Sequence, residues 1–391
     1  MDIAENPFSP GAGDPPPECA GRDEILEEAR ILLMRVKAGR SEKDMLLTGL
    51  RGVGKTVLLN KLEQLAKNTG YKTILIESHE DKSLSVMLIQ PLRRFLHSLD
   101  PAVNQLARRG LAVLKSFITA VKVKYSDIEL GLDIEPELGA ADSGDIELDL
   151  PSLFIAVGEA AKEKNTGLAI LIDELQYFSK QELSALIMAI HKMHQKQLPV
   201  VLIGAGLPVL PALVGESKSY SERLFQFPSV GPLSFEDMER ALQEPVKSRG
   251  VSFTPDALKE IFKMTEGYPY FIQEWGYQAW NYADSPKIDL KIIKKASAQV
   301  MDRLDKNFFR VRFDRLTPAE RNYLRAMAEL ESSPYRSGDV AEILKMPPNA
   351  FGPVREKLIK KGMIYSQAHG EIAFTVPLFD QFIKRTVPNF S

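Results

Sequence analysis

The chain has 391 residues, enough for roughly two or three domains, and 44% of them are hydrophobic and 26% charged, with a formal net charge of −2. That charge excludes a global basic field that would draw the protein onto nucleic acid or membrane. The single cysteine, Cys19, excludes an internal disulfide and a cysteine-ligated zinc site. No apolar run approaches the roughly 20 residues of a membrane span, and the acidic N-terminus is unlike a signal peptide. We therefore expect a cytoplasmic protein without membrane contact.

The chain opens with an arm and a helix. Residues 1–22 are rich in Pro, Gly and Asp, which favour irregular backbone. Apolar residues then recur at helical spacing over about 23–37, which predicts an amphipathic helix. We place the start of the first folded domain at residue 23.

Five short apolar runs, separated by helical stretches, predict a buried parallel sheet. Near-continuous apolar strands are typical of a sheet that helices cover on both faces. A helix over about 180–195 is expected to begin with a capping box of Ser179 and Glu182. Residues 23–233 are therefore predicted to form one α/β domain. Its strands are expected at 45–48, 73–76, 168–172, 200–203 and 225–230.

Residues from about 121 to 150 interrupt this order of strands and helices. The run from Val121 alternates apolar and basic residues, and the run from Asp127 alternates apolar and acidic residues. This pattern predicts an inserted hairpin followed by an acidic loop over 135–149. We favour a solvated surface insertion over an element that binds a partner.

The rest of the chain is predicted to be mostly helical. Residues 234–305 would form a helical lid, with prolines at the start of two helices, and 306–391 a linker followed by a small module. A capping box of Thr317 and Glu320 opens this module. Three helices and a hairpin then follow, which is the order of a winged helix-turn-helix. The helices are expected at about 318–331, 338–345 and 350–361, and the strands at 363–366 and 371–376.

Residues 49–56 read GLRGVGKT and match the phosphate-binding pattern G-x-x-x-x-G-K-[ST] in full. The glycines let backbone N–H groups point at phosphates, Lys55 reaches the β- and γ-phosphates, and the Thr56 hydroxyl ligates Mg²⁺. A helix is expected to start there and to add its positive dipole end. The alternative is an ordinary Gly-rich turn. The expected ATP-binding residues are Gly49, Leu50, Arg51, Gly52, Val53, Gly54, Lys55, Thr56 and Val57.

A second motif supplies two carboxylates at the end of a buried strand. The apolar run 168–172 leads directly into Asp173 and Glu174. Asp173 would hold Mg²⁺ through its water shell, and Glu174 would act as general base toward the attacking water. The alternative is an acidic pair in a loop or a helix cap. Together the two motifs predict an ATPase with ATP and Mg²⁺ as its ligands.

One strand lies between the two motifs, and the catalytic Glu follows the magnesium Asp directly. This arrangement resembles the additional-strand class of P-loop ATPases, which includes the AAA+ and STAND families. The resemblance, closest to initiator-like prokaryotic ATPases, implies that strand 200–203 lies between the P-loop strand and the Asp173 strand. In AAA+ ATPases that strand usually ends in a polar residue that helps to place the water. Here residues 203–208 read IGAGLP, without a side chain that can hydrogen-bond, so we expect slow turnover or a nucleotide-gated switch.

The resemblance implies further site residues. Gly21 and Arg22 occupy the place of a segment that packs against adenine, and Pro269, in Gly-Tyr-Pro, that of a motif that contacts the base. The alternatives are a loop glycine and a helix-initiating proline. Arg223 stands where these ATPases often carry an arginine finger, which would act in trans and requires a homo-oligomer. The alternative for Arg223 is a surface salt bridge.

The partner of the C-terminal module is open at this point. Binding to DNA phosphates needs clustered positive charge, and residues 316–391 carry ten Lys/Arg against eight Asp/Glu, a net charge of +2. We favour double-stranded DNA as partner and keep a STAND-type signalling switch that binds protein as the alternative. A small-molecule kinase would also use a P-loop, but Glu174 argues against it. The candidate DNA contacts are Arg355, Lys357, Lys360 and Lys361.

One histidine pair has the spacing of metal ligands but no other metal signal. His191 and His194 lie three residues apart on a predicted helix, between lysines and without a carboxylate nearby in the sequence. We therefore expect a solvated helix face and no metal site.

Overall fold

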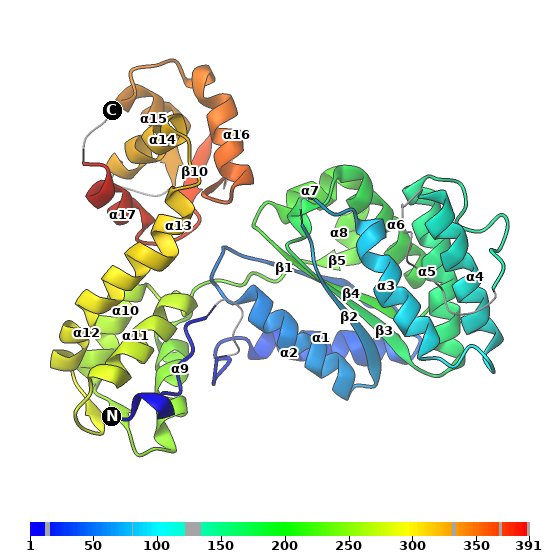
Figure 1. Ribbon diagram of the computed structural model, residues 1–391, viewed down its shortest axis with the longest axis horizontal. Helices are drawn as coiled ribbons and strands as arrows, with labels where there is room; N and C mark the ends of the chain where they lie inside the picture. Colours follow the sequence, from blue (N-terminus) through cyan, green and yellow to red (C-terminus); the bar gives the residue numbers. More distant parts are fainter. Residues whose placement is uncertain (12–15, 80, 122–133, 331–333, 367–369, 389–391) are drawn as a thin grey trace. The chain divides into compact units, whose positions relative to one another are not determined.

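A computed structural model describes residues 1–11, 16–79, 81–121, 134–330, 334–366 and 370–388 (Figure 1). These residues form two compact units. One contains residues 22–49 and 58–229, and the other contains residues 1–21, 50–57 and 230–391. None of the helices in the described ranges combines the length and apolarity that a membrane crossing requires.

The first unit is built on the predicted five-stranded parallel sheet. Its strands lie in the order β2-β3-β4-β1-β5, so β4 separates β1 from β3, as the resemblance implied. The fifth strand has two residues instead of the predicted six, because Pro228 has no N–H to donate to the ladder. The strands are β1 Asp44–Thr48, β2 Tyr71–Glu77, β3 Gly167–Asp173, β4 Val200–Gly206 and β5 Phe225–Gln226.

Helices cover the sheet because three of its strands, β1, β3 and β4, are buried along their whole length. Alternate residues of β3, namely Leu168, Ile170 and Ile172, join one core cluster with residues of the helices α3 to α6. In Figure 1, α4, α5 and α6 lie side by side. The helices of this part of the chain are α1 Asp23–Lys37, α2 Lys55–Asn68, α3 Leu84–His97, α4 Gln105–Ala120, α5 Ile146–Glu163, α6 Lys180–Lys196, α7 Leu210–Ser217 and α8 Ser221–Leu224, and the 3-10 turns are η1 Ile3–Glu5 and η2 Leu175–Tyr177.

The structure confirms one local prediction in this unit and corrects another. The capping box of Ser179 and Glu182 at the start of α6 is confirmed. The acidic loop over 135–149 is wrong at its end, because α5 begins at Ile146. There the carboxylate of Asp149 is buried and accepts hydrogen bonds from the backbone N–H groups of Ser143 (3.1 Å) and Gly144 (2.9 Å). The predicted hairpin falls mostly on residues 122–133, outside the described residues.

The second unit carries the remaining helices. The residues predicted as a lid form α9 Phe235–Lys247, α10 Pro255–Thr265, α11 Pro269–Tyr282 and α12 Leu290–Arg303, with a parallel pair of short strands, β6 Ser252–Phe253 and β7 Lys287–Ile288. The linker that we expected after them is instead helical, since α12 continues through the π-helix η3 Leu304–Phe309 into α13 Arg310–Phe313 (Figure 1). Phe308 and Phe309 explain this, because both are buried against aromatic rings of α11 or α17.

The C-terminal module contains the predicted order of three helices and two strands. The capping box of Thr317 and Glu320 is confirmed. The strand β8 and the helix α17 were not predicted, and β8 joins β10 and β9 in an antiparallel sheet. The elements are α14 Pro318–Glu329, β8 Tyr335–Arg336, α15 Ser337–Ile343, η4 Pro348–Phe351, α16 Gly352–Lys360, β9 Ile364–Ser366, β10 Glu371–Phe374 and α17 Phe379–Thr386.

Candidate functional site

The Gly-rich loop joins the end of β1 to the start of α2. Gly52 and Gly54 have φ angles of +85° and +93°, a region that side chains disfavour, so the tight reversal needs glycine at both positions. Lys55 is 5% exposed, and its Nζ donates a hydrogen bond of 2.8 Å to the carbonyl oxygen of Leu50. The loop is therefore folded around its own lysine, with the first turn of α2 directly following.

The two carboxylates lie at the carboxyl end of β3, at the same sheet edge as the end of β1. Asp173 is 6% exposed and accepts a 2.8 Å hydrogen bond from the N–H of Glu174. Glu174 has left-handed backbone, with φ +56° and ψ +40°. Its carbonyl oxygen accepts a hydrogen bond of 2.5 Å from Ser78 Oγ, just after the neighbouring strand β2. This backbone conformation, uncommon for a residue with a side chain, is thus held from both sides.

A residue that the sequence did not reveal completes this edge. Gln176, in the turn η2, donates from Nε2 to Glu174 Oε2 and accepts at Oε1 a 3.1 Å hydrogen bond from the N–H of Leu207. Leu207 follows β4 directly, where the sequence offers no hydrogen-bonding side chain. The lack of a hydrogen-bonding side chain at the end of β4 was the sequence signal. It does not indicate which distant residue supplies that polar contact.

Two residues of the motifs offer oxygen atoms that could ligate Mg²⁺, which is a hard cation. Thr56 provides a hydroxyl and Asp173 a carboxylate, both oxygen ligands of the type that Mg²⁺ prefers. No group of three or more His, Cys, Asp or Glu suited to a metal occurs in the described residues. Mg²⁺ in phosphate sites commonly takes one or two protein oxygens together with phosphate and water oxygens, so the residues present fit this ion.

The residues expected near adenine occupy constrained positions. Gly21 has φ +69°, and a β-carbon there would lie 2.7 Å from Asp237 Oδ2 at the start of α9. Arg22 is buried. Pro269 is the first residue of α11, and the preceding Tyr268 is fully buried. Whether these residues contact a base stays a prediction.

Arg223 is exposed on α8, directly before β5, which is the position expected of an arginine finger. Its role in trans stays a prediction.

The four candidate DNA contacts differ in their surroundings. Lys357 and Lys360 are exposed on α16, and Lys360 forms a 2.8 Å ion pair with the exposed Glu356. Lys361, by contrast, pairs with the buried Glu320 at 2.7 Å, and Arg355 donates to Ser337 Oγ at 3.2 Å. Arg355 and Lys361 are therefore engaged by residues of other helices of the module, whereas the ion pair of Lys360 lies on the exposed face of α16 itself.

The histidine pair is not the solvated face that we expected. His194 Nε2 lies 2.7 Å from Oδ2 of Asp44, which is fully buried and whose Oδ1 accepts a 2.6 Å hydrogen bond from the N–H of Leu202. The sequence failed here because Asp44 is 150 residues away. His191 instead lies against the ring of Tyr220.

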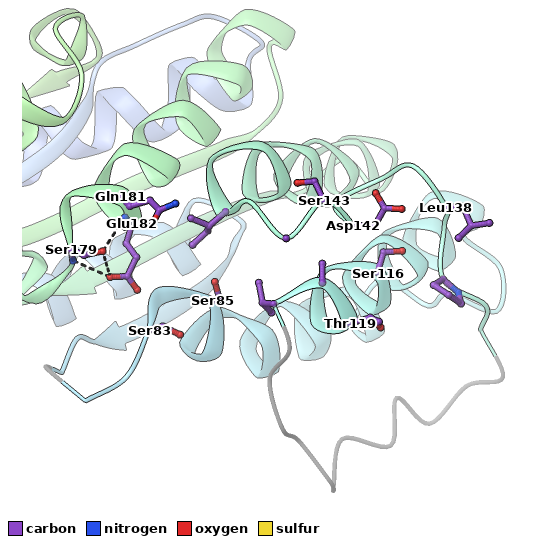
Figure 2. A pocket seen from close by; sticks show the side chains of 15 residues that line it. Ser83, Ser85, Ser116, Thr119, Leu138, Asp142, Ser143, Ser179, Gln181 and Glu182 are labelled. Atoms are coloured by element: carbon purple, nitrogen blue, oxygen red, sulfur yellow. Dashed lines mark hydrogen bonds between the residues drawn. The ribbon is translucent and has the colours of Figure 1, made fainter.

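An open hollow of about 1000 Å³ lies away from these residues, among α3 to α6. Figure 2 shows Ser179 and Glu182 on one wall and Ser116 and Thr119 of α4 on another. Glu182 accepts hydrogen bonds from the N–H groups of Ser179 (2.9 Å) and Leu84 (2.7 Å). The backbone N–H groups at the start of α3 and α6 are thus already bonded to this carboxylate. We assign no ligand to this hollow.

Comparisons with known proteins agree with the fold. Residues 18–203 match the AAA ATPase domain, and residues 306–383 match a domain of unknown function (DUF8462). An uncharacterized HTH-type transcriptional regulator of Methanocaldococcus jannaschii is 24% identical over 370 residues, which cover 90% of this chain and 84% of that protein.

Solved structures are similar over most of the chain. The Walker-type ATPase PABY2304 of Pyrococcus abyssi has a TM-score of 0.61 at 16% identity, covering 95% of this chain and 98% of its own. The Aeropyrum pernix Orc1 protein in complex with DNA has a TM-score of 0.45 at 14% identity, covering 95% and 94%. The first likeness shows the fold alone, and the second is too low to carry an argument.

Proposed function

We propose that this chain, whose residues 18–203 match the AAA ATPase domain, is a P-loop ATPase that works as a Mg²⁺-dependent, nucleotide-gated switch coupled to DNA. One observation carries the ATPase site. In a single parallel sheet, β1 leads into the loop of residues 49–56, and β3 ends in Asp173 and Glu174 at the same edge. Parallel strands present their carboxyl ends together, which is where such sheets bind ligands.

The loop would bind the triphosphate of ATP. Its backbone N–H groups, Lys55 and the start of α2 offer positive ends to the phosphate oxygens. Thr56 and Asp173 would hold Mg²⁺, which supplies charge neutralisation at the β- and γ-phosphate oxygens when bound. Gly21, Arg22 and Pro269 would contact the adenine.

Glu174 would act as the general base. It would accept a proton from a water molecule while the water oxygen forms a bond to the γ-phosphorus. The bond from that phosphorus to the β–γ bridging oxygen breaks, and ADP and phosphate leave. Because contacts to the γ-phosphate exist only before hydrolysis, they would favour one conformation of the chain and release it afterwards.

The coupling to DNA would use the C-terminal module as a winged helix. Two observations support this: the module has the order of elements of that fold, and α16 exposes Lys357 and Lys360. The curated relative is described as an HTH-type regulator. A second candidate is a signalling switch whose module binds protein. It is favoured by the engagement of Lys361 with Glu320 and of Arg355 with Ser337.

Steady-state hydrolysis and ATP binding by Glu174→Gln test the ATPase proposal. We expect kcat to fall by about 100-fold or more, the usual effect of losing a general base, while the Kd for Mg·ATP stays near that of wild type. Unchanged turnover would remove Glu174 from the mechanism.

A further inference from the structure

One amide side chain joins the carboxylate of Glu174 to the neighbouring strand. Gln176 donates from Nε2 to Glu174 Oε2, and its Oε1 lies 3.1 Å from the backbone nitrogen of Leu207. A carboxylate accepts hydrogen bonds and a backbone N–H donates them. The two partners therefore determine which end of the amide is nitrogen, and the link has a single orientation.

The end of β4 leaves room for the Gln176 side chain because its last residue, Gly206, has no β-carbon. A β-carbon at Gly206, the last residue of β4, would lie 2.8 Å from Gln176 Oε1 and 3.0 Å from Leu210 Cδ2. Both distances are shorter than normal contacts, so any larger residue at Gly206 would displace the amide oxygen.

The backbone of Glu174 is fixed independently of Gln176. Its N–H donates to Asp173 Oδ1 and its carbonyl oxygen accepts from Ser78 Oγ. These contacts hold the backbone but leave the side-chain torsions of Glu174 open. Gln176 contacts the carboxylate itself, which is the reacting end.

We propose that Gln176 is the positioning residue for Glu174, supplying from the turn after β3 the polar contact that the end of β4 lacks. The inference rests on the proposed role of Glu174 as general base. Because the link also binds Leu207, it ties the position of the base to the end of β4. A displacement of a catalytic group by about 1 Å can cost on the order of 100-fold in rate.

A double-mutant cycle with kcat, KM and the Kd for Mg·ATP tests the proposal. Gln176→Ala should lower kcat by about 10- to 100-fold and leave the Kd within about twofold. The same substitution should have no further effect on the residual rate of Glu174→Gln, because residues that act through one another are non-additive. Gly206→Ala should reproduce the kcat loss, whereas Gly215→Ala, whose β-carbon would meet nothing within 4 Å, should not.

The kcat–pH profile of Gln176→Glu distinguishes a positioning role from a purely structural one, because a purely structural role would leave the profile unchanged. The substitution keeps an acceptor for Leu207 N–H but faces Glu174 with a second carboxylate. Repulsion between like charges should then shift the acidic limb of the kcat–pH profile to higher pH. The exposed Gln181→Ala, five residues away, serves as a control that keeps the wild-type profile.

The outcomes separate this inference from the proposed function. If Glu174→Gln hydrolyses ATP like wild type, the role of the base is wrong. If Glu174→Gln is slow while Gln176→Ala keeps wild-type kcat, or if the two effects add in full, Gln176 does not act through Glu174 and the inference is overturned.

Discussion

The ring of Tyr268 lies against the α-carbon of Gly52. A β-carbon added at Gly52 would lie 2.9 Å from Cε1 and 3.1 Å from the hydroxyl oxygen of that ring. Tyr268 is fully buried, burial raises the pKa of its hydroxyl, and this hydroxyl has no hydrogen-bond partner among the described residues. Two independent features therefore require glycine at position 52. Its φ of +85° disfavours a side chain, and the Tyr268 ring occupies the space that a β-carbon would need.

Gly52→Ala should weaken ATP binding because the loop must move away from the ring. We expect the Kd for Mg·ATP to rise by about tenfold or more, which corresponds to about 1.4 kcal/mol. Gly39→Ala is the matched control, since Gly39 has φ +73° and its β-carbon would meet nothing within 4 Å. Both variants should lose about 1–2 kcal/mol of unfolding free energy from left-handed backbone, but calorimetry should show weaker ATP binding only for Gly52→Ala. Equal affinities would contradict this reading.

The ion pair of His194 with Asp44 should make stability depend on pH. Burial lowers the pKa of His194, but the hydrogen bond and the charge of Asp44 outweigh it, so the net pKa is raised above 6.5. Burial raises the pKa of Asp44, and His194 opposes that rise. A raised histidine pKa stabilises the fold fully below the unfolded value of about 6.5, and this stabilisation is lost as the pH rises through the folded pKa.

Urea unfolding at pH 6 and pH 9 measures this effect. Wild type should lose on the order of 2 kcal/mol of unfolding free energy, the scale of a charged hydrogen bond, while His194→Gln should show a smaller loss. His191→Gln is the control and should behave like wild type in this range, because burial lowers the pKa of His191. An identical pH dependence for His194→Gln and wild type would show that the pair does not titrate.

If the module binds DNA, exposed lysines on α16 should carry the contact. Lys357→Glu with Lys360→Glu should abolish binding to duplex DNA in fluorescence anisotropy at moderate salt. Each single substitution should reduce the slope of log Kd against log salt by about one. Lys291→Glu, an exposed lysine on α12, makes the same change in charge elsewhere and should bind like wild type. Binding that survives the double substitution would remove α16 as the contact, and no binding by wild type would favour a protein partner.

If Arg223 acts in trans, two inactive variants should complement each other. Arg223→Ala keeps Glu174, and Glu174→Gln keeps Arg223, so a mixture forms sites with both residues intact. Loss of an arginine finger can cost about 10³-fold or more in kcat. We expect the mixture to hydrolyse ATP faster than either variant alone, with activity rising with protein concentration. Activity equal to the sum of the two variants would leave Arg223 as a surface residue.

The sequence predicted the features that depend on neighbours along the chain. Strand β3 is a continuous apolar run, the loop of residues 49–56 has a fixed spacing, and Ser179 and Glu182 lie three residues apart in their capping box. Each is encoded within about eight residues. The place of β4 between β1 and β3 came from the resemblance, since spacing along the chain does not state which strands pair.

The contacts that the sequence missed join distant positions. Gln176 bonds to Leu207, Asp44 to His194, and Glu182 reaches Leu84. Phe309 was missed for the same reason. The segment that contains it was predicted as a linker, because its contacts with Phe271 and Phe379 are distant in the sequence. Local pattern cannot distinguish an acid in a loop from one such as Asp149, which lies in the first turns of a helix and accepts hydrogen bonds from the preceding loop.

The most direct test of the account is calorimetric titration of ATP with and without Mg²⁺ into wild type and Lys55→Ala. In the proposed site the loop and Lys55 bind the triphosphate, while Asp173 and Thr56 hold its metal ion. Wild type should bind ATP more tightly with Mg²⁺, and Lys55→Ala should lose about tenfold or more of that affinity, about 1.4 kcal/mol. Equal affinity of the two proteins, or affinity indifferent to Mg²⁺, would contradict it.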